Sequence, residues 1–217
     1  MDGEGIVGLN PSKALNDIKN INSSICDMQN SLVNSTEAFF TDLSLLWYAP
    51  KAIDFATKIL PKLETINDEI ISFNDTTITN CVSAFNRLAS SHGTSGINVA
   101  PGPYTTANYP VLKDVGPDGQ VGMQVAQVRT SVDAYLSAIK GISGALAGVP
   151  SRIAFYDTDG GFSGACQTNV NRLRNLIEDA ISAIIAEIEP AIQENTQSTE
   201  QAASTAAQTM GGAGHSF

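Results

Sequence analysis

The sequence predicts an all-α protein, an elongated four-helix bundle made of two tandem antiparallel helical hairpins. Apolar residues recur at gaps of three, four and seven along four stretches of the 217-residue chain, which is typical of helices that pack along a seam. A stretch rich in Gly and Pro separates these four stretches into two pairs. Each pair contains a short bend marked by aromatic and small residues. Together these observations predict two helical hairpins in one chain.

The first hairpin is predicted at residues 11–93, after a flexible N-terminus at residues 1–10. The chain bends at residues 45–50, where Pro50 suits the start of the second helix because a proline there loses no helical hydrogen bond. Gly93 can cap the end of that helix in a left-handed conformation. The seam of the first helix consists of Leu15, Ile18, Ile21, Ile25, Met28, Leu32, Phe39, Leu43 and Leu46. The seam of the second helix consists of Ala52, Ala56, Ile59, Leu63, Ile66, Ile70, Phe73, Cys81, Phe85 and Leu88.

Residues 94–119 are predicted to form a linker loop, because Gly, Pro, Asn and Thr cluster there, notably at residues 101–103 and 116–119. Four aromatic or apolar residues are expected to hold this loop against the helices, since a wholly mobile linker would carry fewer of them. These residues are Tyr104, Tyr109, Val111 and Leu112.

The second hairpin is predicted at residues 120–200, with a turn at residues 155–164. Beyond it, residues 201–217 contain almost no large apolar side chain, and we expect a disordered C-terminal tail. The third seam consists of Val121, Val125, Val128, Val132, Tyr135, Ile139, Ile142, Leu146 and Val149. The fourth consists of Cys166, Val170, Leu173, Ile177, Ile181, Ile184, Ile188 and Ile192.

The composition narrows the classes of partner and of compartment. A formal net charge of −10 with only 12 Lys and Arg argues against nucleic acid, because binding phosphates requires a basic surface. The most apolar windows are interrupted by charges and glycines, so we predict no membrane span. The acidic N-terminus lacks the apolar region of a signal peptide. Three cysteines form no disulfide framework, and we expect buried thiols.

Residue types that carry chemistry are few and scattered. His92 at a helix end and His215 in the tail have no neighbouring acid or thiol at the spacing of a catalytic triad. The cysteines and histidines show no paired spacing of zinc ligands. The turn Asp157–Gly161 has its glycine in the wrong place for a calcium loop, so it is interpreted as a turn that caps the next helix. We therefore predict no enzyme, no cofactor and no metal site.

The two bends share one pattern: an aromatic residue, a small residue two positions later, and a large apolar residue six positions after that. Its members are Trp47, Ala49 and Phe55 at the first bend and Phe162, Gly164 and Val170 at the second. We interpret Trp47 and Phe162 as buried plugs at the closed ends of the hairpins. Tyr48 and Tyr156 are the residues expected to contact a partner.

An aromatic residue, any residue and a small residue at the bend of a long helical hairpin resemble the Trp-x-Gly (WXG, ESAT-like) family of type VII secretion proteins. In that family each protein is a single hairpin near half this length, and two of them pair antiparallel into a four-helix bundle. The resemblance covers residues 11–92 and 121–200. Trp47-Tyr48-Ala49 keeps the tryptophan of the motif, and Phe162-Ser163-Gly164 keeps its glycine.

The resemblance implies a non-enzymatic helical protein, acting as a secreted effector, targeting or partner-binding module. It would be cytoplasmic before export and would reach the medium or cell surface without a signal peptide. Its partner would be the secretion machinery or a related helical protein, and its state a monomer or homodimer. The alternative is a structural subunit of a phage, virion or bacterial surface assembly, where acidic helices rich in Asn, Ser and Thr are also common.

Overall fold

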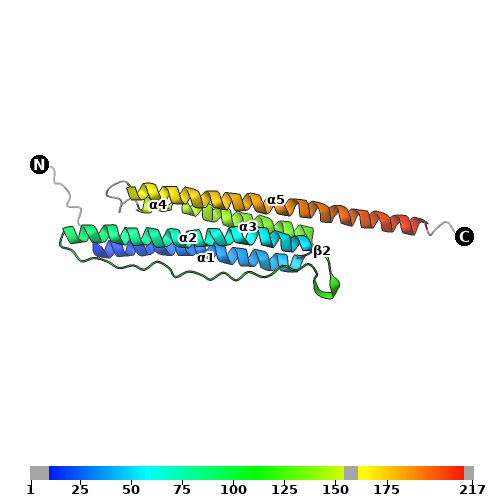
Figure 1. Cartoon of the computed structure of the whole chain (residues 1–217), viewed down its shortest axis with the longest axis horizontal. Helices are drawn as coiled ribbons and strands as arrows, with labels where there is room; N and C mark the ends of the chain where they lie inside the picture. Colours follow the sequence, from blue (N-terminus) through cyan, green and yellow to red (C-terminus); the bar gives the residue numbers. More distant parts are fainter. Residues whose placement is uncertain (1–9, 154–160, 213–217) are drawn as a thin grey trace. The chain divides into compact units, whose positions relative to one another are not determined.

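The computed structural model describes residues 10–153 and 161–212, and nearly all of its regular structure is α-helix (Figure 1). The predicted all-α helical bundle class is confirmed. The helices are α1 (Pro11–Leu46), α2 (Pro50–Ser91), α3 (Val125–Leu146), α4 (Val149–Ile153) and α5 (Gly161–Gly212). A short 3-10 helix, η1, spans Pro117–Gly119, and the two short strands are β1 (Trp47–Tyr48) and β2 (Gly122–Met123).

The predicted seams form the buried faces of the helices. Every seam residue of α5 is less than 9% exposed. The first two seams are also buried, apart from four half-buried residues: Leu15, Leu46, Ala56 and Leu88. The exception is Val121, which is 66% exposed. It precedes β2, and α3 begins only at Val125, so its prediction as a seam residue is wrong. The helices form because each apolar stripe finds a packing surface.

Two compact units divide the chain, and each takes part of both predicted hairpins. Unit 1 contains Glu64–Ala107, Ala138–Ile177 and the chain up to Asn34. Unit 2 contains Ser35–Leu63, Asn108–Ser137 and the chain from Glu178 onward. Each unit therefore has its own set of helical segments and its own core.

Within unit 2, neighbouring helices run antiparallel. The side chains of Thr36 on α1 and Tyr135 on α3 are hydrogen-bonded at 2.9 Å between their oxygens. On α2, Lys58 forms an ion pair with Glu187 on α5 at 2.8 Å. The strands β1 and β2 pair antiparallel, so the residues just before α3 are held at the bend between α1 and α2. The second predicted hairpin thus starts where the first one turns.

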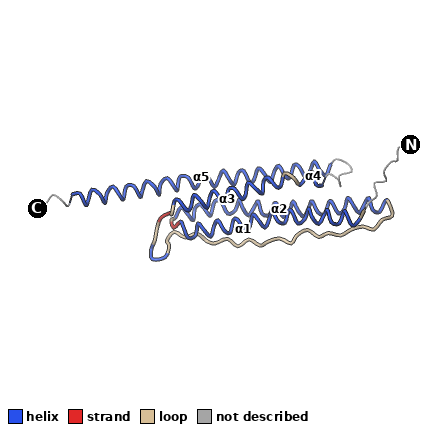
Figure 2. The backbone as a smooth tube through the Cα atoms, turned by 180° about the vertical axis from the view of Figure 1, so that it is seen from behind, coloured by secondary structure: helices blue, strands red, loops and turns tan. Residues whose placement is uncertain are grey.

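In unit 1, polar side chains join α1 to α2 and α2 to α5. On α1, Gln29 Nε2 donates to Asn67 Oδ1 of α2 at 2.7 Å. The α2 helix is joined to α5 by an ion pair in which Arg172 donates to both carboxylate oxygens of Glu69. The extended segment that follows α2 runs back beside α1 and α2, and Figure 2 draws it as loop.

Two boundaries differ from the predictions. The helix α5 continues to Gly212, so residues 201–212 are helical where we expected disorder; residues 213–217 lie outside the described part of the chain. In the linker, Tyr104 is half-buried and Leu112 is only 3% exposed, as expected for residues that hold it in place. Val111 is 79% exposed, so its predicted contact with the helices is wrong.

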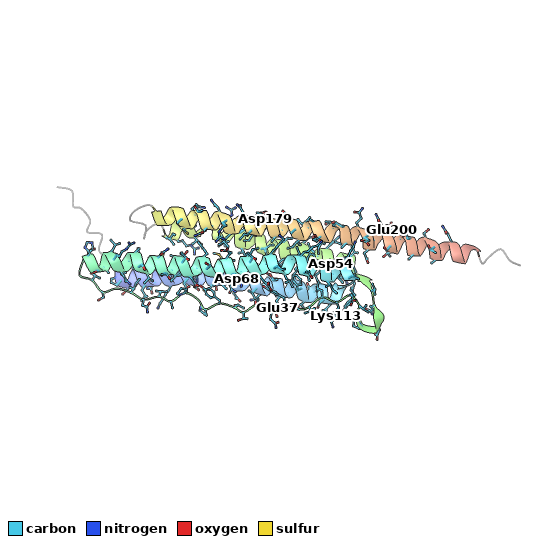
Figure 3. All side chains as sticks on the ribbon, viewed as in Figure 1. Glu37, Asp54, Asp68, Lys113, Asp179 and Glu200 are labelled. Atoms are coloured by element: carbon cyan, nitrogen blue, oxygen red, sulfur yellow. The ribbon has the colours of Figure 1, made fainter. Side chains whose placement is uncertain are left out.

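Charged side chains occupy the outer faces. Figure 3 labels the acidic residues Glu37, Asp54, Asp68, Asp179 and Glu200, all of which are exposed. Among the described residues, every helix lacks an apolar stretch of the length needed to cross a bilayer.

Candidate functional site

The bend between α1 and α2 places the tryptophan of the chain in the core of unit 2. Trp47 is only 2% exposed. Its backbone pairs with Met123 across the β1–β2 bridge, and the N–H of Gln124 donates to the carbonyl of Leu46 at 2.8 Å. Ala49 is half-buried and accepts a hydrogen bond from the N–H of Ala52 at 2.9 Å. These backbone bonds close the bend around the indole ring.

Aromatic rings continue from the bend into the core of unit 2. The Trp47 and Phe55 rings lie 5.7 Å apart, and Phe55 is 6.2 Å from Phe39 in an edge-on contact. Phe39 in turn stacks on Tyr135 at 4.5 Å with the planes 4° apart. Burial raises the pKa of Tyr135, although the hydrogen bond with Thr36 opposes that shift. Such clusters contribute packing and quadrupole energy beyond their buried area, so they stabilise the bend.

The structure also shows what surrounds Tyr48. Its ring is half-buried, and a Cβ atom placed on Gly116 would lie 2.7 Å from it. The chain's own loop therefore covers one side of this ring. An open hollow of about 400 Å³ next to Tyr48 is lined by Leu46, Tyr48, residues 120–124, Asn195 and Thr199. Asn195 Nδ2 donates to the carbonyl of Met123 at 3.2 Å, which ties α5 to the same place.

Large apolar side chains that are exposed gather in unit 2. Leu45 is 60% exposed and Val121 is 66% exposed, and both lie within two residues of a paired strand. Within the described part of unit 1, no large apolar residue is exposed to this degree. Among the residues whose burial the structure describes, the exposed set is Leu45, Ile53, Val111, Val115, Val121 and Ile185. Exposed apolar groups that gather in one part of a molecule are typical of protein contact surfaces.

The second bend is described only in part. Tyr156 and the side chain of Phe162 lie outside the described residues. Gly164 is exposed in the first turns of α5, and Val170 is fully buried. Of the residues that form the two bend patterns, Trp47 and Phe55 are brought into contact.

Possible metal ligands are scattered over the described residues. No group of three or more His, Cys, Asp or Glu among them could hold a metal ion. His92 is exposed, and His215 lies outside the described range. Of the free thiols, Cys26 is half-buried and the other two are buried. Burial raises the pKa of Cys81 to about 12 and that of Cys166 to about 11, so both stay protonated and unreactive near neutrality.

One set of functional residues was missed from the sequence: buried amides next to the seams. In unit 1, Gln29, Asn67 and Asn74 are at most 9% exposed, and they form a hydrogen-bonded layer between α1, α2 and the extended segment. The signal was present, because Asn22 and Gln29 on one helix and Asn67 and Asn74 on the other are each seven residues apart. Polar residues at heptad spacing beside a seam mark a buried polar layer.

The comparisons place no known protein beside this fold. No family model, no curated protein and no solved structure matches the chain. The class is therefore defined by the structure itself: an all-α helical bundle protein with a tryptophan-plugged bend.

Proposed function

We propose that this chain is a non-enzymatic, WXG-like protein of type VII secretion that acts as a secreted effector, targeting or partner-binding module. The observation that carries the proposal is Trp47, buried at a hairpin bend against Phe55, with the β1–β2 bridge joining the start of the second hairpin to that bend. In the WXG family two separate hairpins pair antiparallel. A chain whose second hairpin begins at the tip of its first supplies an antiparallel pair covalently.

The partner in this proposal is a protein, and its contact surface is the region around the bend in unit 2. Leu45 and Val121 supply exposed apolar area within two residues of the paired strands, and half-buried Tyr48 pairs with Gly122 in that bridge. The net charge of −10 disfavours nucleic acid as a partner. The chain would be cytoplasmic before export and then secreted or held at the cell surface, as a monomer or homodimer.

An export assay tests the proposal. In the bacterium that encodes the chain, we expect it in the culture medium when the type VII ATPase is intact and only in the cells when that ATPase gene is deleted. A protein exported through a cleavable signal peptide serves as control and must be unaffected. Unchanged export in the deletion strain, or absence from the medium in both strains, would overturn the proposal.

A matched pair of variants tests the contact surface. The double substitution Leu45→Ser with Val121→Ser removes apolar area at the bend, and we expect export to fall at least several-fold. Ile185→Ser changes an apolar residue of α5 in the same unit that is 42% exposed, and export should stay at the wild-type level. Trp47 fluorescence and circular dichroism check that both variants fold. Equal export of the two variants would place the contact surface elsewhere.

A further inference from the structure

The extended segment after α2 is bound to the helices of unit 1 mainly through its backbone. Three side-chain amides each donate to the carbonyl and accept from the N–H of a single residue, as a neighbouring β-strand would do. Asn86 binds Ile97 with N···O distances of 2.9 and 2.7 Å, and Asn22 binds Gly102 with 2.7 and 3.1 Å. Gln29 binds Thr105 with 2.8 and 2.9 Å. We call residues 94–107 the strap and these three amides the clamps.

The spacing of two clamps matches the geometry of an extended chain. Asn22 and Gln29 are two helical turns apart, which corresponds to about 10 Å along α1. The strap residues that they bind, Gly102 and Thr105, are three positions apart, which is also about 10 Å in an extended backbone. The spacing of the two clamps along α1 therefore equals the spacing of the two strap residues that they bind.

A second layer of amides holds the clamps in place. Asn67 accepts a hydrogen bond from Gln29 at 2.7 Å, and Asn74 Nδ2 donates to Asn22 Oδ1 at 2.8 Å. Both Asn67 and Asn74 are at most 9% exposed. These buried partners hold the clamps in the orientation that binds the strap.

Two positions of the strap add selectivity to this backbone recognition. Gly102 has φ +87°, a conformation that favours glycine over residues with a side chain. Tyr104 donates its hydroxyl hydrogen to Asp75 at 2.6 Å and accepts from Asn74 at 3.0 Å. The side chains of Asn98, Ala100 and Pro103 are exposed in the strap. We call the surface of α1 and α2 that carries the three clamps the groove. It selects an extended backbone with glycine at the second clamp and tyrosine two residues later.

We propose that this groove between α1 and α2 is a binding site for an extended segment of another polypeptide, which the strap occupies within the chain. Its ligand is an unstructured protein segment with the Gly-x-Tyr-Thr pattern of residues 102–105. The strap can leave without unwinding a helix, because residues 95–107 belong to no helix or strand and follow the turn of Gly93, where φ is +65°. While attached, it competes at a high effective concentration. This site lies in unit 1 and does not rest on the function proposed for the bend.

A peptide-binding experiment on the full chain tests the proposal. The substitution Gly102→Val disfavours the bound conformation of the strap but leaves α1 and α2 unchanged. The probe is a fluorescent peptide of residues 95–107, and its anisotropy reports binding. We expect the Gly102→Val chain to bind this peptide at least ten-fold more tightly than the wild-type chain, in which the strap fills the groove.

The control is the double variant Asn22→Leu with Gly102→Val, in which we expect affinity to fall at least ten-fold; a peptide that itself carries Gly102→Val should bind equally poorly. Absence of peptide binding to folded Gly102→Val, or binding that survives Asn22→Leu, would overturn the proposal. If circular dichroism shows that Gly102→Val does not fold, Tyr104→Ala releases the strap instead and is judged by the same two outcomes.

Discussion

Unit 1 and unit 2 use successive stretches of the same helices, yet the contact between α1 and α2 has different chemistry in each. In unit 2 it contains the rings of Phe39, Phe55 and Trp47, at centroid distances of 6.2 and 5.7 Å. In unit 1 it contains the amide pairs Gln29–Asn67 and Asn22–Asn74 at 2.7 and 2.8 Å. One heptad pattern therefore supports both an aromatic core and a polar layer.

The aromatic cluster and the amide layer interact differently with the backbone segments that pass beside them. An aromatic cluster gains its energy from buried area and stays closed around its own rings. A buried amide has more hydrogen-bonding groups than one partner can satisfy, so it also binds backbone that passes nearby. Unit 1 accordingly holds the strap through its backbone, whereas unit 2 closes a bend around Trp47.

The largest expected effect breaks the aromatic side of this comparison. Trp47→Ala removes a ring that is 2% exposed and packed on Phe55, and we expect a loss of about 3–5 kcal/mol in the free energy of unfolding. Urea unfolding followed by circular dichroism measures it. Leu45→Ala, two residues away at a side chain that is 60% exposed, should change stability by less than about 0.5 kcal/mol. Equal effects of the two substitutions would contradict a buried plug.

The substitution Gln29→Ala disrupts the amide layer of unit 1. It removes both backbone bonds to Thr105 and the bond to Asn67, and we expect a loss of about 2–3 kcal/mol, because partly buried polar groups lose their partner. Hydrogen exchange in residues 94–107 should accelerate, while Trp47 fluorescence in unit 2 should not change. The control is Asn30→Ala, which loses the contact of an exposed side chain with the Thr105 hydroxyl. Unaltered exchange in Gln29→Ala would argue against the clamp.

Alkaline pH should weaken the protein through the two buried thiols of unit 1. Below pH 9, the ordinary pKa of a thiol here, Cys81 and Cys166 are protonated in the folded and the unfolded chain alike. Above it the unfolded chain loses its protons first, so stability falls as pH rises toward the folded pKa values of about 12 and about 11. We expect each thiol to contribute a loss of roughly 2 kcal/mol by a pH of about 10.5. In the double variant Cys81→Ala with Cys166→Ala, the free energy of unfolding should depend less on pH in this range. An unchanged pH dependence would show that the tyrosines cause it.

The smallest losses of stability are expected at the surface, where an ion pair joins α2 to α5 in each unit. Glu69→Gln in unit 1 removes a two-pronged contact with Arg172, and Lys58→Gln in unit 2 removes a contact with Glu187. We expect losses of up to about 1 kcal/mol for the first and about 0.2–0.5 kcal/mol for the second, both suppressed by salt. The Arg172 hydrogen bond lowers the pKa of Glu69, so its contribution disappears on acidification through that lowered pKa. A larger loss in Lys58→Gln would reverse this order.

Much of the helical core could be predicted without coordinates. The seams from Ile18 to Leu43 and from Cys166 to Ile192 are buried as the heptad spacing indicated. Trp47 and Phe55 belong to neither predicted seam, and their ring contact at 5.7 Å emerges only from the folded bend. An apolar stripe has one stable solution in water, which is to face another stripe.

The tertiary structure alone decided the partners of the polar groups. Neither Asn22 nor Gln29 belongs to a predicted seam, and their partners in the strap lie 80 and 76 residues away. The heptad spacing placed Val121 in a seam, whereas the pairing of β1 with β2 exposes it and starts α3 only at Val125. Apolar burial depends on a periodicity written along one helix, but a hydrogen bond needs one particular donor and acceptor to meet, and only the folded chain brings them together.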